Sequence, residues 1–352
     1  MNTRKACGFL LLLALFCLFP GNASGASVTL TGAGATFPLP FYLKVFDQYH
    51  LQTGAEIRYQ GVGSGKGVQK LLAREVDFAG TDIASSREEG TSGDAFVRIP
   101  TCIGAVTIVY NLPGNPRLRF TAEVLADLFL GGIAVWNDPR IAALNPNVPL
   151  PGLPIQVIHR SDGSGTTDIL SEYLSKASRA WREAMGAGKV LRWPVGRGTR
   201  GNAGVAGLVK EISGSVGYVE LIYAMGNDMT FGQLANRSGR FVAPSMESIA
   251  MAAETAKHTN GNRSLTDTPA SAGYPVVGYT WIVVFKDQSS RVGIQRKTAE
   301  ELIRLLYWIT HEGQRYAEEL HYVPLPRAAV LQAEADLRKI TFQGRPLLKR
   351  RR

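Results

Sequence analysis

An arginine, a carboxylate and several hydroxyl groups follow one another closely in residues 160–167, which read Arg-Ser-Asp-Gly-Ser-Gly-Thr-Thr. The largely apolar residues 155–158 precede this segment and predict a strand, and apolar residues recur after it at helical spacing. A turn that leads into a helix here presents free backbone N–H groups, hydroxyl donors and a planar guanidinium. These groups favour the binding of a tetrahedral oxyanion. The alternative is an ordinary strand-to-helix turn in which Asp162 or Ser164 caps the helix.

The chain makes the same kind of turn twice more. Residues 31–38 read Thr-Gly-Ala-Gly-Ala-Thr-Phe-Pro and follow a short apolar start at 28–30, and Pro38 suits the first turn of a helix. Residues 61–67 read Gly-Val-Gly-Ser-Gly-Lys-Gly, follow a predicted strand and lead into a helical pattern. Each turn carries a hydroxyl group near the start of its helix, so three helix N-termini could point at one anion.

These turns carry a family resemblance. The chain resembles the periplasmic phosphate-binding proteins of bacterial high-affinity phosphate ABC transporters, the PstS family. The matching stretches run through nearly the whole chain after residue 25 and comprise residues 30–38, 59–64, 76–78, 81–82, 160–166, 193–196, 201–202 and 214–220. The departures are mild. Ser-Gly-Lys-Gly replaces the Ser-Ser-Gly-Gly that the family often has, which puts Lys66 near the site rim, and Thr81 keeps a hydroxyl where serine is common.

The resemblance implies which residues bind phosphate. They lie on the three glycine turns and after one further strand, and are Thr36, Phe37, Ser64, Asp82, Arg160, Asp162, Ser164, Gly165 and Thr166. Neutral hydroxyl and amide donors would disperse the charge of the dehydrated anion, and Arg160 would supply the one strong cation. Asp162 either fixes the fork of that guanidinium or simply caps the helix. Asp82 either accepts a hydrogen bond from a proton that phosphate keeps or forms an ordinary turn.

Short strands alternate with amphipathic helices along the chain, which is typical of an α/β protein with mostly parallel sheets. The predicted strands are 57–60, 77–79, 102–110, 155–158, 216–219 and 278–285. The predicted helices are 40–51, 66–74, 121–130, 167–178, 203–212, 246–257, 298–312 and 327–338. Residues 260–273 are polar and lack periodicity, which predicts a surface loop.

The resemblance also implies a two-lobed periplasmic-binding-protein fold of type II. Each lobe would be a mostly parallel sheet flanked by helices, with the ligand in the hinge cleft. We expect residues 26–107 and 276–343 to form lobe 1 and residues 108–275 to form lobe 2. On this division the first two turns and Asp82 lie on one lobe and the turn at 160–166 lies on the other. An anion bound by both lobes would hold the cleft closed.

The start of the chain predicts export. Residues 1–25 combine an early basic pair, an apolar stretch and small residues, which indicates a signal peptide that is cleaved near Ala26 and places the protein in the periplasm. Its removal leaves Cys102 as the one cysteine, so no internal disulfide can form. The apolar neighbours of Cys102 predict a buried, inert thiol.

Charge excludes one class of partner. The formal net charge of +10 includes basic residues of the signal and of the tail at 344–352, which we expect to be solvated. The sequence has no basic stripe interleaved with aromatic residues, so nucleic-acid binding is not expected.

We therefore expect the solute-binding component of an importer, which captures inorganic phosphate and delivers it to inner-membrane permease subunits and their ATPase. The protein would act as a monomer, without a cofactor or a metal and without chemistry on its ligand. A phosphate sensor or surface phosphate-binding protein without transport is the alternative. A phosphatase is a weaker interpretation, because the five histidines lack metal-ligand spacing and residues 61–67 do not fit a Walker loop.

Overall fold

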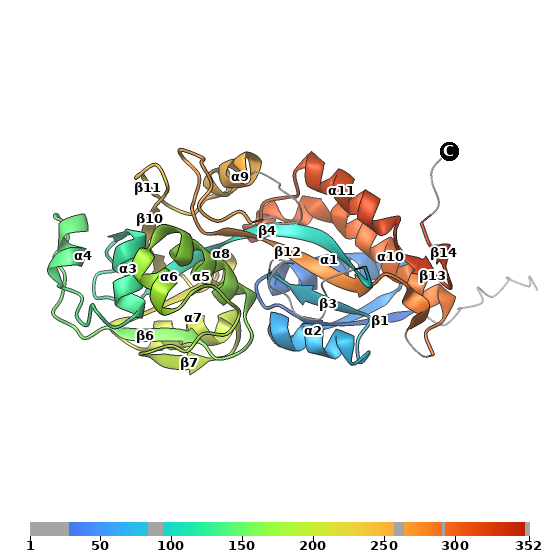
Figure 1. The fold of residues 1–352 in the computed structure, drawn as a ribbon, viewed down its shortest axis with the longest axis horizontal. Helices are drawn as coiled ribbons and strands as arrows, with labels where there is room; N and C mark the ends of the chain where they lie inside the picture. The colour runs from blue at the N-terminus through green and yellow to red at the C-terminus, as the bar shows by residue number, and fades with distance from the viewer. Residues whose placement is uncertain (1–27, 84–93, 257–263, 291–292, 349–352) are drawn as a thin grey trace, which may run out of the picture.

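The computed structural model describes residues 28–83, 94–256, 264–290 and 293–348. Figure 1 shows two bodies that lie side by side and are joined by long strands. The predicted signal at 1–25, its cleavage near Ala26 and the last residues of the basic tail lie outside the described residues. Within the described ranges, no helix is long and apolar enough to cross a membrane.

One sheet runs through both bodies, in the order β2-β1-β3-β12-β4-β8-β6-β7, with β9 paired to β4. The strands of the first body are β1 (Thr29–Gly34), β2 (Glu56–Gly61), β3 (Phe78–Thr81) and β12 (Val277–Phe285). Those of the second are β6 (Gln156–Arg160), β7 (Arg197–Thr199), β8 (Ser215–Glu220) and β9 (Thr230–Phe231). The outer pairs are parallel, as predicted, whereas β12 pairs antiparallel with β3.

Strand β4 (Phe96–Tyr110) belongs to both bodies. Residues 96–105 pair antiparallel with β12, and residues 106–110 pair antiparallel with β8. We name the body that contains β1, β2, β3 and β12 lobe 1, and the body that contains β6, β7, β8 and β9 lobe 2. The change of partner within β4 falls between residues 105 and 106. The exact division of the chain at 107/108 and 275/276 stays a prediction.

Helices cover both faces of the sheet in each lobe (Figure 1). In lobe 1 one face carries α1 (Leu39–Thr53), α10 (Arg296–Thr310) and α11 (Arg327–Leu337), and the other carries α2 (Ser64–Leu72). In lobe 2 one face carries α3 (Ala122–Phe129), α5 (Gly165–Ala177) and α6 (Arg179–Ala184), and the other carries α7 (Gly201–Glu211) and α8 (Leu221–Met225).

Alternation along the strands builds these layers, because successive side chains of a strand point to opposite faces. Leu30 of β1 and Phe78 of β3 join the large core that extends through both lobes. Ala33, three positions after Leu30, and Ala79, next to Phe78, point to the other face and pack with Val68 of α2. The sheet is therefore buried on both faces, and the helix N-termini are held at its edge.

The remaining elements are short. A separate small sheet has the order β11-β10-β5 and consists of β5 (Arg119–Phe120), β10 (Gln233–Ala235) and β11 (Phe241–Val242). Helices α4 (Pro139–Leu144) and α9 (Met246–Thr255), the hairpin of β13 (Thr341–Phe342) and β14 (Arg345–Pro346), and three 3-10 turns at Gln288–Ser290, Glu312–Tyr316 and Glu318–Leu320 complete the described chain.

Each predicted strand and helix is present with its ends shifted by at most two residues, except that β4 begins at Phe96, six residues before its predicted start. Residues 260–273 need a correction. Their described part, 264–273, has no helix or strand, but Leu265 and Ala270 are buried. The amide Nδ2 of Asn236 donates to the backbone oxygens of Ala270 and Gly273, at 3.3 and 3.1 Å, and so satisfies polar groups that would otherwise favour solvent.

Cys102 lies in β4 and is fully buried. Burial raises the pKa of its thiol well above the ordinary value. The prediction of a buried thiol is confirmed.

Candidate functional site

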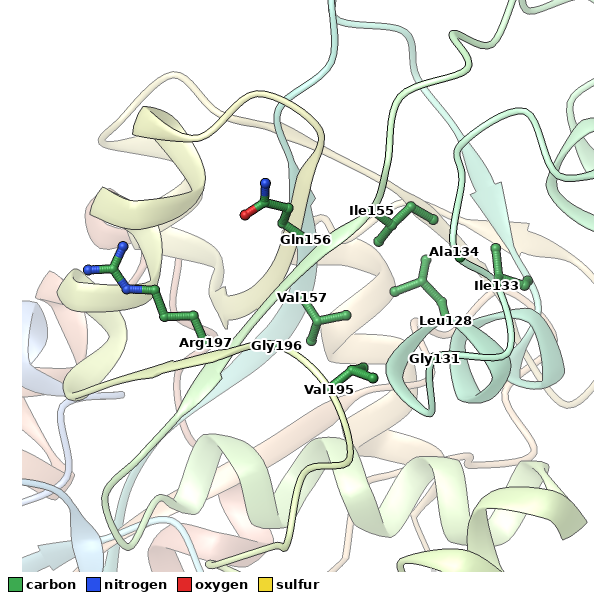
Figure 2. Close-up of a pocket in the computed structure, with 10 residues that line it drawn as sticks. All are labelled: Leu128, Gly131, Ile133, Ala134, Ile155, Gln156, Val157, Val195, Gly196 and Arg197. Carbon is green, nitrogen blue, oxygen red and sulfur yellow. The ribbon is translucent and has the colours of Figure 1, made fainter.

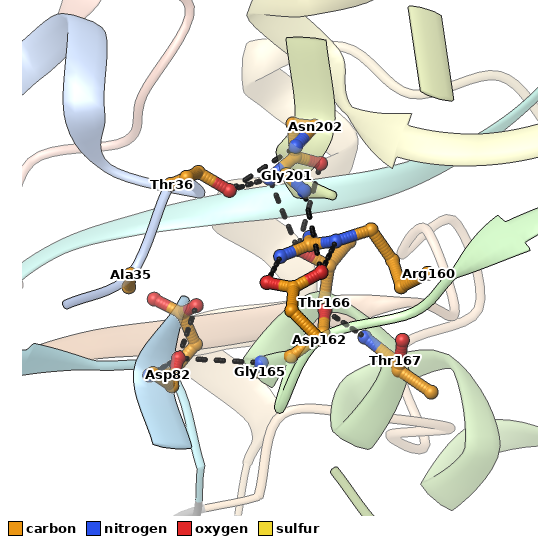
Figure 3. Close-up of polar contacts among 12 residues, drawn as sticks. Ala35, Thr36, Asp82, Arg160, Asp162, Gly165, Thr166, Thr167, Gly201 and Asn202 are labelled. Carbon is orange, nitrogen blue, oxygen red and sulfur yellow. Dashed lines mark hydrogen bonds and ion pairs between the residues drawn. The ribbon is translucent and has the colours of Figure 1, made fainter. Parts of the chain in front are cut away.

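The three predicted turns meet where the two lobes face each other, and Figure 3 labels residues of the first and the third. The turn between β1 and α1 carries Thr36, and the turn between β2 and α2 ends at Ser64. Asp82 follows β3 on the same lobe. Across the cleft lies the turn between β6 and α5, which begins at Arg160. These four side chains are all less than 8% exposed.

Arg160 and Asp162 form a bidentate ion pair inside the lobe 2 turn. Nε and Nη2 of Arg160 donate to the two carboxylate oxygens of Asp162, at 2.7 and 2.5 Å. Burial works to raise the pKa of the Asp162 carboxyl, but the hydrogen bonds and charge of Arg160 outweigh it and leave that pKa below its ordinary value. Of the two interpretations of Asp162, the structure shows the one in which it fixes the guanidinium fork.

The cap of α5 is Ser164. Its Oγ accepts from the backbone N–H of Thr167 at 3.1 Å, and the side chain is fully buried. This bond uses the oxygen as acceptor, so the hydroxyl hydrogen remains a donor. Thr166, two residues later, accepts from Nη1 of Arg160 at 3.3 Å. The lobe 2 turn is thus held by bonds within itself and by a bond from the backbone N–H of Gly201, on the same lobe, to Asp162 at 3.2 Å.

Ser64 links the two lobes. Its Oγ accepts from the backbone N–H of Gly165 at 3.2 Å, and its hydroxyl lies 3.3 Å from Oδ2 of Asp82. The other oxygen of Asp82 accepts from the hydroxyl of Thr280 on β12. Only glycine fits at 165, because a Cβ there would lie 2.5 Å from the side chain of Asp82 and 2.8 Å from Oγ of Ser64.

The first turn also reaches across the cleft. Oγ1 of Thr36 accepts from the backbone N–H and the side-chain Nδ2 of Asn202, at 3.1 and 3.0 Å. The carbonyl of Thr36 accepts from the hydroxyl of Tyr223 at 2.6 Å. Phe37 is fully buried, and its carbonyl accepts from the hydroxyl of Tyr322 at 2.6 Å. The structure therefore brings all nine sequence-predicted residues to one region; their role in binding stays a prediction.

Asn202 is the residue that the sequence reasoning missed. It lies in the first turn of α7, and its Nδ2 donates to Thr166 at 3.1 Å as well as to Thr36. A signal was available: the pair Gly201-Asn202 belongs to the stretches that match the family, and it begins a helix directly after β7. Because β7 has only three residues, no hydrophobic period marked this fourth strand–turn–helix junction.

A groove opens at the mouth of the site. It has a volume of about 600 Å³ and is lined in part by Thr36, Gly65, Asp162 and Gly201. Three cationic residues from both lobes share this lining, namely Lys66, Lys189 and Arg200. The lysine predicted at the rim therefore lies beside the site, and the entrance carries positive charge.

A second hollow lies on lobe 2, between α3 and the strands β6 and β7 (Figure 2). Its lining is largely apolar and includes Leu128, Ile155 and Val157, with Arg197 at one side. Not one of the nine predicted residues lines it. The groups suited to an anion are therefore gathered at the cleft between the lobes and not at this hollow.

His159 lies directly before Arg160 on β6 and is held by its neighbours. In the part of the chain that the structure describes, no group of three or more His, Cys, Asp or Glu residues could hold a metal. The imidazole of His159 stacks on Trp193, with ring centroids 4.9 Å apart, and its Nδ1 lies 3.1 Å from the carbonyl of Arg160. The site is built from donors that are held in place by neighbouring groups.

Known proteins resemble this chain in sequence. The family model described as the PBP superfamily domain matches residues 20–312. A phosphate-binding protein PstS of Xylella fastidiosa (strain 9a5c) is 41% identical over 323 residues, which cover 90% of this chain and 86% of that protein. The PstS of Haemophilus influenzae (strain ATCC 51907 / DSM 11121 / KW20 / Rd) is 40% identical over 307 residues, covering 86% of this chain and 90% of that protein.

Solved structures show the same fold at low sequence identity. A high-affinity periplasmic phosphate-binding protein, PfluDING, bound with phosphate has a TM-score of 0.69 at 19% identity, covering 91% of this chain and all of that one. An ABC-type phosphate transport receptor from Vibrio cholerae has a TM-score of 0.54 at 18% identity, covering 84% of this chain and all of that one. These likenesses identify the two-lobed fold.

Proposed function

We propose that this chain, which belongs to the PBP superfamily and within it to the PstS family of phosphate-binding proteins, binds inorganic phosphate between its lobes as the solute-binding component of a phosphate importer. The observation that carries the proposal is the ion pair between the buried Arg160 and the half-buried Asp162, which faces the carboxylate of Asp82 across the cleft. The comparisons support the ligand class, because their names describe phosphate-binding proteins.

The charges favour an anion that still carries a proton. Asp162 already neutralises Arg160, so the guanidinium brings no net positive charge to the pair. Asp82 then adds a buried carboxylate on the opposite lobe. Near neutral pH phosphate keeps one or two protons and can donate one to this carboxylate, whereas sulfate has none to donate. The buried hydroxyls of Thr36, Ser64 and Thr166 would disperse the remaining charge of the ligand.

The proposal also covers the oligomeric state, the location and the transport partners of the protein. We infer that the protein acts as a monomer in the periplasm and hands phosphate to inner-membrane permease subunits and their ATPase. The relatives are binding proteins, and we expect no turnover of the ligand. Purified protein that hydrolyses a chromogenic phosphate ester, at a rate that follows the protein through purification, would contradict this part.

Calorimetric titration of the mature protein with phosphate, arsenate and sulfate tests the ligand. We expect tight binding of phosphate, binding of arsenate because it also carries a proton, and rejection of sulfate. Phosphate should also raise the melting temperature, since a ligand that binds only the native state stabilises it by mass action. A melting temperature that does not change at millimolar phosphate would overturn the proposal.

A further inference from the structure

Asn202 joins the polar groups of the two lobes without belonging to any of the three predicted turns. Its backbone N–H and its Nδ2 both donate to Oγ1 of Thr36 on lobe 1, at 3.1 and 3.0 Å. The same Nδ2 donates to Oγ1 of Thr166 on lobe 2, at 3.1 Å. The side chain is fully buried, so these bonds do not compete with bulk water.

The orientation of this amide is set by its other end. Oδ1 of Asn202 accepts from the backbone N–H of Glu220 at 3.0 Å. A backbone N–H can only donate, so the amide oxygen must lie on that side and the amino group must face the two threonines. Glu220 is itself fixed, because its carboxylate accepts from the N–H of Ile222 at 2.8 Å and caps α8.

The two threonine hydroxyls then have their acceptor capacity filled. A hydroxyl has two acceptor lone pairs and one hydrogen. Thr36 accepts two bonds from Asn202, and Thr166 accepts one from Asn202 and one from Arg160 at 3.3 Å. A contact in the opposite sense, from Thr166 to Oδ1 of Asn202, is 3.5 Å long and therefore weak. Each hydroxyl hydrogen is left to donate elsewhere.

We infer that Asn202 is a positioning residue that makes both threonines donors toward an oxyanion in the cleft. It acts on Thr166 within lobe 2, and it acts on Thr36 only when the lobes are closed. The inference rests on the proposed binding of phosphate and adds a group that sets the polarity of the site without touching the ligand. Binding of an anion is favoured because both threonine hydroxyls act as donors, and a ligand group that offered a donor at these two positions would find no acceptor there.

Two substitutions separate this role from simple packing. Asn202→Asp keeps the shape but replaces the amino group by a second acceptor, which would draw the threonine hydrogens toward itself and add a buried negative charge. Asn202→Ala removes the group and leaves the hydroxyls free to rotate. If Asn202 only filled space or supported α7, the isosteric change would be the milder one.

Calorimetric titration with inorganic phosphate is the measurement, with melting temperature and circular dichroism as the check on folding. We expect Asn202→Ala to weaken phosphate binding about fivefold, the size of one neutral hydrogen bond. Asn202→Asp should weaken it at least about tenfold further. An aspartate variant that binds phosphate as well as the alanine variant, or better, would overturn the inference. Wild-type protein that fails to bind phosphate would instead overturn the proposed function.

A second pair of variants keeps the test decisive if Asn202→Asp does not fold. Thr36→Val removes the hydroxyl through which Asn202 acts while it preserves the shape of the side chain. In the Thr36→Val background, Asn202→Ala should weaken phosphate binding about twofold or less, because the hydroxyl of Thr36, one of the two that Asn202 positions, is already absent. A cost that stays near fivefold in both backgrounds would show that Asn202 does not act through Thr36 and would overturn the inference.

Discussion

The two halves of the site are built on different plans. The lobe 2 half completes itself: Arg160 pairs with Asp162 two residues away, and Ser164 caps its own helix. The lobe 1 half finds partners elsewhere, since Ser64 accepts from Gly165 and Thr36 from Asn202, both on lobe 2. One half is therefore ready before the cleft closes, and the other is finished only by closure.

The halves also differ in charge. Lobe 2 contributes a buried guanidinium that is already paired with Asp162 and acts as a hydrogen-bond donor, whereas the buried charge of the lobe 1 half is the carboxylate of Asp82. The difference suggests a division of labour in which lobe 2 supplies attraction to any oxyanion and lobe 1 decides which oxyanion stays. Substitutions on the lobe 2 side should therefore change mainly the affinity for phosphate, and the substitution of Asp82 on lobe 1 should change mainly the selectivity between oxyanions.

The largest effect should come from Arg160→Ala. Truncating one partner of a desolvated charge pair costs about 2–5 kcal/mol, so phosphate binding should weaken by more than about tenfold. Calorimetry measures it. Arg197→Ala is the matched control, because Arg197 lines the separate hollow of lobe 2, whereas Arg200 lines the groove at the site and is a poorer control. Greater weakening from Arg197→Ala would show that the site is elsewhere.

Asp162→Asn should destabilise the phosphate-free protein by about 3 kcal/mol at neutral pH, since breaking a buried ion pair costs about 3–5 kcal/mol. Burial opposes ionisation, but Arg160 prevails and holds the pKa of Asp162 below its ordinary 3.8. The stabilisation is thus complete above about pH 4 and is lost as the pH falls through the folded-state pKa. Denaturant unfolding at neutral pH and at successively lower pH below 3.8 should show the difference in unfolding free energy between the variant and wild type becoming smaller. A constant difference would contradict the ion pair as its source.

On the lobe 1 side, Asp82→Asn should change selectivity more than affinity. It replaces one acceptor by a donor, which should narrow the preference for phosphate over sulfate about tenfold, the effect of removing one repulsive contact. Most of the change should appear as better binding of sulfate in competition titrations. A variant that rejects sulfate as strongly as wild type would place selectivity elsewhere and end the proposed division of labour.

A matched pair of serines gives the smallest effects and the sharpest contrast. Ser64→Ala removes a bond between lobes, so phosphate affinity should fall about threefold to tenfold while the melting temperature without phosphate stays nearly unchanged. Ser164→Ala removes a helix cap that is worth about 1 kcal/mol, so the phosphate-free protein should melt earlier. Thermal melts with and without phosphate separate the two. Equal effects on the phosphate-free protein would remove the distinction between the halves.

The same contrast explains what could be predicted from sequence. The turn from Arg160 to Thr166 is local, so its residue types and spacing were enough to indicate its chemistry. The contact between Thr36 and Asn202 joins residues 166 positions apart, and no local pattern encodes it. Likewise the short strand β7 and the helices α6 and α8 have too few residues to show a period. In the polar segment 264–273, Ala270 is buried, and its carbonyl accepts from Nδ2 of Asn236, which lies outside that segment and could not be predicted from it.

The shared strand β4 also bears on the order in which the protein assembles. The main strands of lobe 2 lie in one stretch of chain, from β4 to β9, and pair within it. In lobe 1, by contrast, Thr81 meets Thr280, 199 residues away, so β3 cannot complete its sheet until β12 is present. Pairing strands that lie so far apart in the chain costs conformational entropy, which contacts between residues closer in the chain must first offset. A nascent chain that ends before residue 277 can thus form the turn from Arg160 to Thr166. It lacks β12, the strand whose Thr280 holds Asp82 in place.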